Sequence, residues 1–147
     1  MKKTHLIILS ALIFTLTSCS IRRLEKMNVY KEVSAESFEE LLKEPDINII
    51  DVRTRSEFEK SHISGAQNAS YFSGHFDELV DSLNLDTSRK TLIYCETQHR
   101  SLFAAKKLYK AGFKTIVDLD KGMLHWRKND FPYVESDSIS HIKDTLK

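Results

Sequence analysis

Residues 92–101 read LIYCETQHRS, and this stretch decides the fold class of the chain. The run at 91–94 is short and rich in apolar, β-branched and aromatic side chains, which predicts a buried β-strand. Cys95 stands where that strand ends, a short polar loop follows it, and a helix is expected from Arg100 to Ala111. Open α/β sheets bind ligands outside the carboxyl ends of their strands. The loop that starts at Cys95 is therefore the first candidate for a functional site.

The alternation of short strands and amphipathic helices continues on both sides of this stretch. Further strands are predicted at 29–33, 47–52 and 115–119, and further helices after Ser34, after Thr54, at 75–83 and after Gly122. Thr54 and Glu57 have the spacing of a capping box, and Gly112 stands where a C-cap glycine belongs. Residues 63–71 are expected to be irregular. Strands that alternate with helices predict an α/β domain with a mainly parallel central sheet flanked by helices.

The beginning of the chain has the features of an export signal. Residues 1–18 combine Lys2 and Lys3 with an uncharged, mostly apolar run at 6–16, which is too short to span a bilayer and fits the core of a secretory signal. The segment Leu16-Thr17-Ser18-Cys19 resembles a bacterial lipobox, so Cys19 is the expected lipidation site. Simple secretion is the alternative. We expect a protein of the bacterial cell envelope that is lipid-anchored to a membrane and faces the periplasm.

The rest of the chain divides into a lipidated tether at 19–30, one domain at 31–134 and a polar tail at 135–147. Lys and Arg together number 22 and Asp and Glu 21, and this near balance argues against nucleic-acid binding as the main function. Two cysteines exclude a disulfide-dense scaffold and a four-cysteine zinc site. The histidines show no ligand spacing, so neither a metal nor a cofactor is expected.

The position of Cys95 suits a reactive thiol. Backbone N–H groups of a loop that leads into a helix can converge on one point, and the helix N-terminus adds positive potential, so a thiolate is stabilised there. Arg100 adds a permanent positive charge and a fork of donors suited to an oxyanion, and a protonated His99 would add another charge. The alternative is an inert buried cysteine. The Cys-x4-Arg spacing favours the reactive thiol.

Five segments in order resemble the signatures of the rhodanese (sulfurtransferase) family over about residues 30–134. They are DVR at 51–53, EF at 57–58, SHISGAQN at 61–68, CETQHRS at 95–101 and a closing pattern from Gly112 to Trp126. The chain is similar to a single-domain rhodanese in an exported form. The resemblance implies the three-layer rhodanese-like fold, in which a mainly parallel sheet lies between helices.

The resemblance also implies a sulfurtransferase that works through a persulfide on Cys95. The sulfur donor would be thiosulfate or a persulfide, and the thiophilic acceptor would be cyanide or a thiol. The expected substrate-binding residues of the loop are Glu96, Thr97, Gln98, His99, Arg100 and Ser101. Related phosphatases have a wider loop, of the form Cys-x5-Arg, so the shorter loop here favours sulfur transfer. The remaining expected partner is a membrane, reached through the lipid anchor, and no nucleic acid is expected.

Two loop residues depart from the family pattern. Gln98 replaces a glycine, and if this position needs a positive φ the substitution costs on the order of 1 kcal/mol or more. Glu96 places a carboxylate next to the thiol, where it would repel a dianionic donor. Thiosulfate is therefore expected to be a poorer donor than a less charged persulfide. Asp51 and Arg53 are expected to support the pocket, as an ion pair at the end of a strand.

Two other functions compete with the enzyme. One is a binding module with the rhodanese fold, whose altered loop no longer turns over. The other is a thiol redox protein that uses Cys95 alone, and it would need a partner thiol because Cys19 is consumed by lipidation. Retention of Cys95 together with Arg100 favours the sulfurtransferase.

Overall fold

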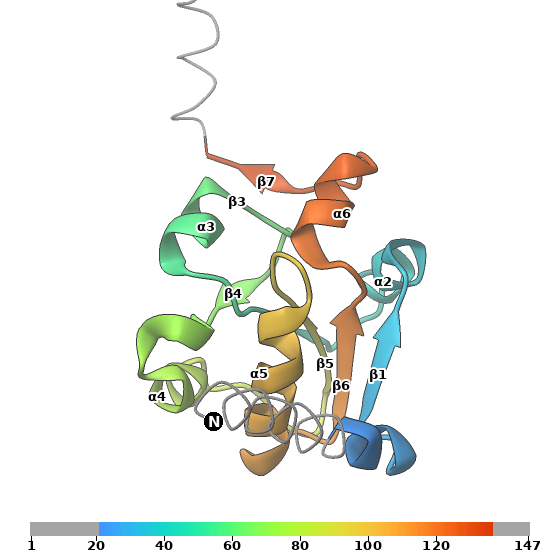
Figure 1. The fold of residues 1–147 in the computed structure, drawn as a ribbon, viewed down its shortest axis with the longest axis vertical. Coiled ribbons are helices and arrows are strands. Elements are labelled where there is room, and N and C mark those ends of the chain that lie inside the picture. Colours follow the sequence, from blue (N-terminus) through green and yellow to red (C-terminus); the bar gives the residue numbers. More distant parts are fainter. Residues whose placement is uncertain (1–20, 137–147) are drawn as a thin grey trace, which may run out of the picture.

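The computed structural model describes residues 21–136, and its centre is a five-stranded sheet (Figure 1). The strands are β1 (Tyr30–Val33), β2 (Asn48–Asp51), β4 (Gln67–Asn68), β5 (Lys90–Tyr94) and β6 (Thr115–Leu119). Their order in the sheet is β1-β6-β5-β2-β4, and all neighbouring strands are parallel. A separate antiparallel pair joins β3 (Ser61–His62) to β7 (Val134–Glu135).

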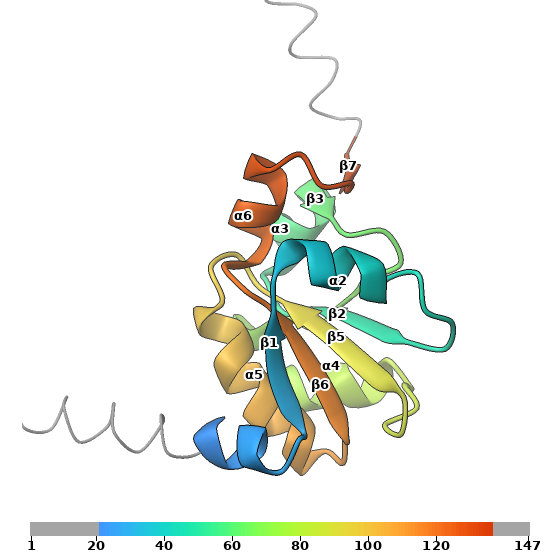
Figure 2. The ribbon, with the colours of Figure 1, turned by 90° about the vertical axis from the view of Figure 1, so that its right-hand side faces the viewer.

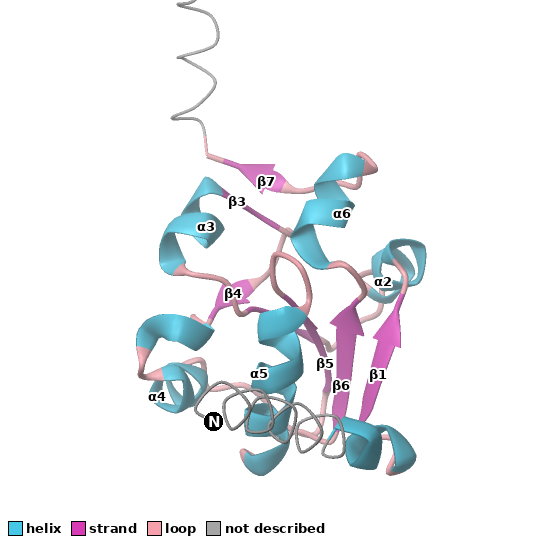
Figure 3. Ribbon diagram, in the orientation of Figure 1, coloured by secondary structure: helices cyan, strands magenta, loops and turns pink. Residues whose placement is uncertain are grey.

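Helices lie on both sides of the central sheet (Figure 3). They are α2 (Ala35–Leu41), α3 (Arg55–Lys60), α4 (Phe76–Ser82), α5 (His99–Lys110) and α6 (Gly122–Lys128), with a 3-10 turn η1 (Tyr71–Ser73) before α4. The expected α/β class, with a mainly parallel sheet flanked by helices, is confirmed.

The strands divide the core into two layers because successive side chains point to opposite faces of a sheet. Ile93 and Cys95 face the layer that holds the buried side chains of α4 and α5. Leu92 and Tyr94 face the other layer, which packs around Trp126 of α6 and the buried side of α2. Figure 2 shows the sheet from the side, with β1 at its edge. The candidate nucleophile therefore belongs to the layer between the sheet and α5.

Local sequence signals define several helix ends as expected. The Thr54 side chain accepts from the Glu57 N–H at 3.4 Å while the Glu57 carboxylate accepts from the Thr54 N–H at 2.9 Å, which completes a capping box. Ser34 caps α2 through the Ser37 N–H. Gly112 follows α5 with φ +97, a conformation that favours glycine.

The structure differs from the sequence expectations in three places. The segment 63–71, expected to be irregular, contains β4 and the start of η1. The tether expected at 19–30 is not free from residue 21 onward, because residues 21–26 are helical and Leu24 is buried in the core. Strand β7 includes Glu135, which the sequence placed in the tail.

The proposed signal at 1–18, the lipidation site Cys19 and the tail from 137 onward lie outside the described residues. Within residues 21–136, no helix is both long enough and apolar enough to cross a membrane.

Candidate active site

The loop between β5 and α5 lies between α3 and α6, at the carboxyl end of the central strands (Figure 1). Cys95 opens this loop, and its side chain is 1% exposed. Glu96 and Gln98 are half-buried, whereas Thr97 and His99 are exposed. The Thr97 hydroxyl and His99 Nδ1 lie 3.2 Å apart. These two expected substrate-binding residues thus lie on the solvent-exposed side of the loop and not at its buried base.

The N-terminus of α6 holds the loop from behind. The N–H groups of Met123 and Leu124 donate to the carbonyl oxygens of Cys95 and Glu96 at 2.8 and 3.0 Å. In a trans peptide the N–H points away from the preceding carbonyl, so the amides of Glu96 and Thr97 point away from α6. Two loop amides are thereby directed together, as the binding of an anion or a sulfur atom requires.

Gly122 makes this close approach of α6 possible. It has φ +61, and a Cβ atom at this position would lie 2.4 Å from the Cys95 carbonyl oxygen and 2.7 Å from that of Glu96. No side chain fits in that space without moving the loop. The family-like glycine is therefore required by the loop itself, as well as by the turn into α6.

Gln98, which replaces a glycine of the family pattern, does adopt a positive φ. Its φ is +73, and it stands as the N-cap of α5 without a side-chain capping bond. Its Nε2 atom is buried and has no hydrogen-bond partner among the described residues. The loop accommodates the glutamine at the cost of a left-handed conformation and an unpaired amide group.

Ser101 connects the loop to the first turn of α5. Its hydroxyl donates to the Gln98 carbonyl oxygen at 2.8 Å, and the Cys95 thiol lies 3.7 Å from its Oγ, within range to donate a weak S–H hydrogen bond. Ser101 is fully buried. Ser101 is thus a buried polar group that contacts the Cys95 sulfur from the interior of the protein.

Arg100 is held by a bidentate ion pair with Glu57 of α3. Two guanidinium nitrogens donate to the two carboxylate oxygens, each at 2.7 Å. The hydrogen bonds from Arg100 lower the pKa of Glu57 to about 2. Glu57, and to a smaller extent Cys95, raises the pKa of Arg100. Arg100 therefore lies close to the sulfur, but its fork is shared with a protein carboxylate rather than reserved for a donor anion.

Glu57 was not among the residues that the sequence assigned to the site. Its sequence signals were the capping box with Thr54, which predicts a helix start, and the EF pair at 57–58, which is one of the five family signatures. Its second role, orientation of Arg100, depends on a contact between residues 43 positions apart. The sequence alone gave no sign of that contact.

Asp51 and Arg53 form a buried ion pair beneath the loop, with side chains 0% and 1% exposed. Arg53 Nη2 donates to Asp51 Oδ2 at 2.7 Å and also to the Ser61 carbonyl oxygen. Burial raises the pKa of Asp51, and the hydrogen bonds from Arg53 oppose that effect. The expected supporting pair is present, and it is fully buried.

Glu96 has two cationic partners. Its carboxylate accepts from Arg53 Nη1 at 3.2 Å and from Nη2 of Arg127, a residue of α6 that the sequence analysis missed. The negative charge that was expected to repel donors is thus compensated within the protein. This contact also links the loop to β2 and α6 through side chains.

Two hollows flank the loop. The first has a volume of about 480 Å³ and is lined mostly by charged residues, namely Arg53, Glu57, Lys60, Ser61, Glu96, Arg127 and Glu135. The second is smaller and aromatic, and it is lined by Tyr71, Phe72, His99, Arg100 and Phe103. In the described part of the chain, no cluster of three or more His, Cys, Asp or Glu side chains could hold a metal ion.

The Glu57–Arg100 pair predicts an acid-sensitive contribution to stability. A carboxylate whose folded pKa is lowered to about 2 stabilises the fold fully above its unfolded value near 4.5, and this contribution disappears as the pH falls toward 2. After allowance for solvent screening, we expect Glu57→Gln to cost about 1–2 kcal/mol at neutral pH. Urea unfolding of both proteins between pH 7 and 2.5 measures this. A stability difference that stays constant over that range would contradict it.

The fold and the loop define the class of this protein before any comparison. It is a parallel α/β domain in which Cys95, the one cysteine of residues 21–136, opens a strand-to-helix loop that is held by Arg53 and Arg127 through Glu96 and by the backbone of α6. The rhodanese-like domain family matches residues 34–129, well over half of the chain. The chain belongs to this family.

Individual relatives agree with the family. The chain is 32% identical over 99 residues to a thiosulfate sulfurtransferase, GlpE, of Coxiella burnetii, covering 67% of this chain and 89% of that protein. It is 31% identical over 103 residues to a putative sulfur carrier protein, YrkF, of Bacillus subtilis, covering 69% of this chain. The match spans 54% of the Bacillus protein, so this chain corresponds to about half of that relative's length.

Solved structures show the same fold. The rhodanese-like domain of an Anabaena protein superposes with a TM-score of 0.62 at 26% identity, covering 71% of this chain and 78% of that one. A rhodanese-related protein of Thermoplasma volcanium gives 0.61 at 25% identity, covering 71% and 98%. The rhodanese-like fold expected from the sequence is confirmed.

Proposed function

We propose that this chain is a sulfurtransferase that carries sulfane sulfur as a persulfide on Cys95. The observation that carries the proposal is the loop geometry: α6 binds the carbonyls of Cys95 and Glu96, so the loop amides face the opposite side. Thiosulfate sulfurtransferases among the relatives support the same reaction. A loop built in this way stabilises a thiolate before attack and a terminal persulfide sulfur after it.

The reaction balances in two steps. The Cys95 thiolate attacks the outer sulfur of thiosulfate, the S–S bond of the donor breaks, and sulfite leaves with the electron pair. With a persulfide donor the leaving group is a thiolate. An acceptor then attacks the terminal sulfur, and the Cys95 thiolate is released. Cyanide becomes thiocyanate and a thiol becomes a persulfide, with no external oxidant or reductant in either case.

Intact-mass measurement tests the proposal directly. The Cys19→Ser chain retains one thiol, Cys95, since the sequence holds two cysteines. Incubation with thiosulfate or a low-molecular-weight persulfide is expected to add one sulfur atom, and cyanide is expected to remove it. A Cys95→Ser version is the control and should gain nothing. A folded protein with a reactive thiol that takes sulfur from neither donor would favour the binding module instead.

The Glu96 contacts predict the donor preference. Glu96→Gln removes one negative charge and leaves Arg53 and Arg127 beside the loop. We expect the KM for thiosulfate to fall by roughly 3–10-fold at low ionic strength, and the effect to shrink as salt is added. The KM for a less charged persulfide should change less. Glu44→Gln is the matched control, because Glu44 pairs with Lys90 at the start of β5, away from the loop. Equal changes for both donors would contradict the prediction.

We also propose that the sequence at 1–19 exports the protein and anchors it through a lipid on Cys19. The support is the apolar run followed by Leu16-Thr17-Ser18-Cys19. Sulfur transfer would then take place at the periplasmic side of a membrane. Cell fractionation with fatty-acid labelling tests this, because the label and the membrane association should both be lost in Cys19→Ser. Label that persists in that variant would overturn the anchor.

A further inference from the structure

A polar cluster is buried directly behind the loop, between the sheet and α5. Its centre is Asp118 of β6, which is 0% exposed. Asp118 Oδ2 accepts a hydrogen bond of 2.9 Å from the Tyr30 hydroxyl of β1. Its second oxygen, Oδ1, is buried and has no partner among the described residues. A buried carboxyl oxygen without a donor is costly, so this group requires an explanation.

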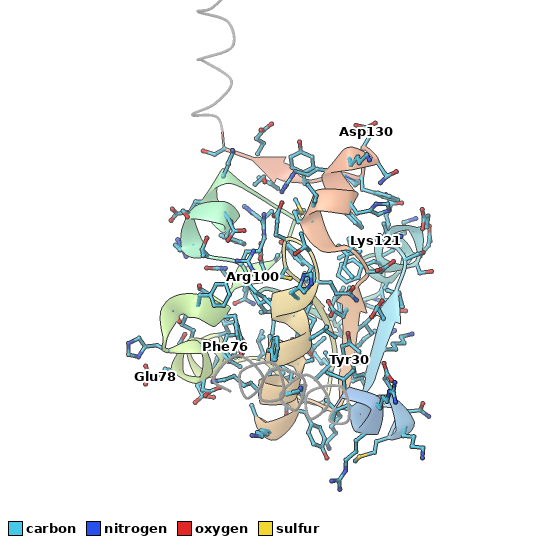
Figure 4. All side chains as sticks on the ribbon, in the orientation of Figure 1. Tyr30, Phe76, Glu78, Arg100, Lys121 and Asp130 are labelled. Carbon is cyan, nitrogen blue, oxygen red and sulfur yellow. The ribbon has the colours of Figure 1, made fainter. Side chains whose placement is uncertain are left out.

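The cluster reaches Cys95 through Ser101. Asp118 pairs in register with Ile93 of β5, and Ile93 and Cys95 face the same core layer. The Ser101 hydroxyl lies against the Asp118 carboxyl from the α5 side, and Ser101 Oγ is 3.7 Å from the sulfur. In Figure 4 Tyr30 lies lower in the molecule than Arg100, which marks the loop. The polar groups thus run from β1 beneath the loop to the nucleophile.

The surroundings of Asp118 favour its neutral form. The groups that act on it are Tyr30 and Glu32 of β1, Ser101 of α5 and the backbone N–H of Leu119, and none of them is a cation. Burial raises the pKa of Asp118 well above its ordinary value, while the hydroxyls of Ser101 and Tyr30 act in the opposite direction. The contrast with Asp51 is direct, since that carboxylate is equally buried but is paired with Arg53.

We propose that Asp118 is a neutral carboxylic acid whose Oδ1 proton is donated to Ser101 Oγ, which makes Asp118 a positioning residue for Cys95. The proton gives Oδ1 the hydrogen bond that it otherwise lacks. Ser101 Oγ then accepts from Asp118 and from the Cys95 thiol, while its own proton goes to the Gln98 carbonyl. The hydrogen bond from Asp118 holds the Ser101 oxygen in place but leaves its O–H bond free to rotate. When Cys95 is a thiolate or carries a persulfide, the hydroxyl can therefore donate to the sulfur instead of to Gln98.

An ionised Asp118 would have the opposite effect. Its carboxylate would draw the Ser101 proton toward itself and place a negative charge behind the sulfur, so the thiolate would be disfavoured. A neutral and an ionised Asp118 therefore predict different changes in the ionisation of Cys95 when Asp118 is substituted. The inference rests on the proposed function only for its catalytic consequence, because ionisation of Cys95 is measured without any sulfur donor.

The test is the pH dependence of Cys95 alkylation by iodoacetamide in the Cys19→Ser chain. Asp118→Asn retains a donor without a charge, and we expect its midpoint to stay close to that of the parent chain. Asp118→Leu retains the branched shape but removes the donor, and we expect its midpoint to rise by about one pH unit, a tenfold loss of thiolate at neutral pH. Infrared difference spectra should show a protonated carboxyl band that is lost in both variants.

Thr91→Val is the matched control. Thr91 is fully buried at the start of β5 and bonds to Asn48 rather than to the site. It should lower stability without moving the alkylation midpoint. A midpoint that falls by a unit or more in Asp118→Asn would show a charged Asp118 and overturn the proposal. A midpoint that is unchanged in Asp118→Leu would overturn it as well, because Asp118 would then be structural only.

If alkylation behaves as expected and no donor loads sulfur, the proposed function fails while the assignment of Asp118 stands. If sulfur is transferred and the alkylation midpoints do not distinguish the two Asp118 variants, the assignment fails and the proposed function stands.

Discussion

Gly122→Ala is expected to remove sulfur loading of Cys95 almost completely. The new Cβ would lie 2.4 Å from the Cys95 carbonyl and 2.7 Å from the Glu96 carbonyl, and both atoms are backbone. Either α6 moves away or the loop shifts, and in both cases the Met123 and Leu124 hydrogen bonds that orient the loop are lost. We expect sulfur loading to fall more than about 100-fold, since positioning and anion stabilisation fail together. The unfolding free energy should fall by about 2–4 kcal/mol.

Gly74→Ala is the control for this prediction. Gly74 also has a positive φ, +81, but a Cβ there meets nothing within 4 Å. The substitution should cost only about 1 kcal/mol through its backbone conformation and leave sulfur loading intact. Denaturant unfolding and intact-mass measurement of sulfur loading in both variants distinguish the backbone strain, which the two glycines share, from the close contact with the loop, which only Gly122 has. Similar losses of loading in the two variants would show that the close approach of α6 is not what orients the loop.

Arg53→Met is expected to destabilise the fold by about 3–5 kcal/mol. The substitution leaves Asp51 buried without its cation, removes a donor from the Ser61 carbonyl and takes one partner from Glu96. The long apolar side chain of methionine retains most of the volume, so the loss reflects the missing charge and donors rather than a cavity. Urea unfolding at neutral pH measures the change.

Arg55→Met is the matched control, since Arg55 is exposed: it forms an ion pair with Glu59 one helical turn away, and its guanidinium lies 5.9 Å from the centre of the Phe58 ring. Its cost should stay below about 0.5 kcal/mol. Combining Asp51→Asn with Arg53→Met should recover part of the stability, because it removes the unpaired charge. If Arg53→Met costs no more than Arg55→Met, the buried pair does not support the fold.

The sequence predicted those parts of the fold that depend on local patterns. Strands β2, β5 and β6 lie within one residue of the expected apolar runs, and the capping box at Thr54 begins α3 as expected. Strand β4 was missed because its two residues, Gln67 and Asn68, are polar and show no apolar alternation. The helical turn at 21–26 was missed because one buried side chain, Leu24, decides its packing against the domain.

The site was predicted up to the point where contacts between distant segments decide it. The Cys95 loop and its short length follow from the sequence and its resemblance to the family, whereas the positive φ of Gln98, which the sequence raised only as a condition, is shown by the structure. The partner of Arg100 on α3 and the partner of Glu96 on α6 do not, because no local pattern indicates which side chains meet across the sheet. The sequence predicts an uncompensated negative charge on Glu96 in the loop. In the structure this charge is paired with Arg53 and Arg127.

The pairing of β1 with β6 also determines the order in which the site can form. Among the strands of residues 21–136, β1 pairs only with β6, more than 80 residues later, and the backbone donors behind Cys95 come from α6, which follows β6. A chain that emerges from its N-terminus can complete neither the sheet nor the cysteine loop until residues near 124 are available. Such distant pairings form slowly. A nascent or C-terminally truncated chain would expose its thiol without the loop that directs it, so the reactive state is restricted to finished molecules.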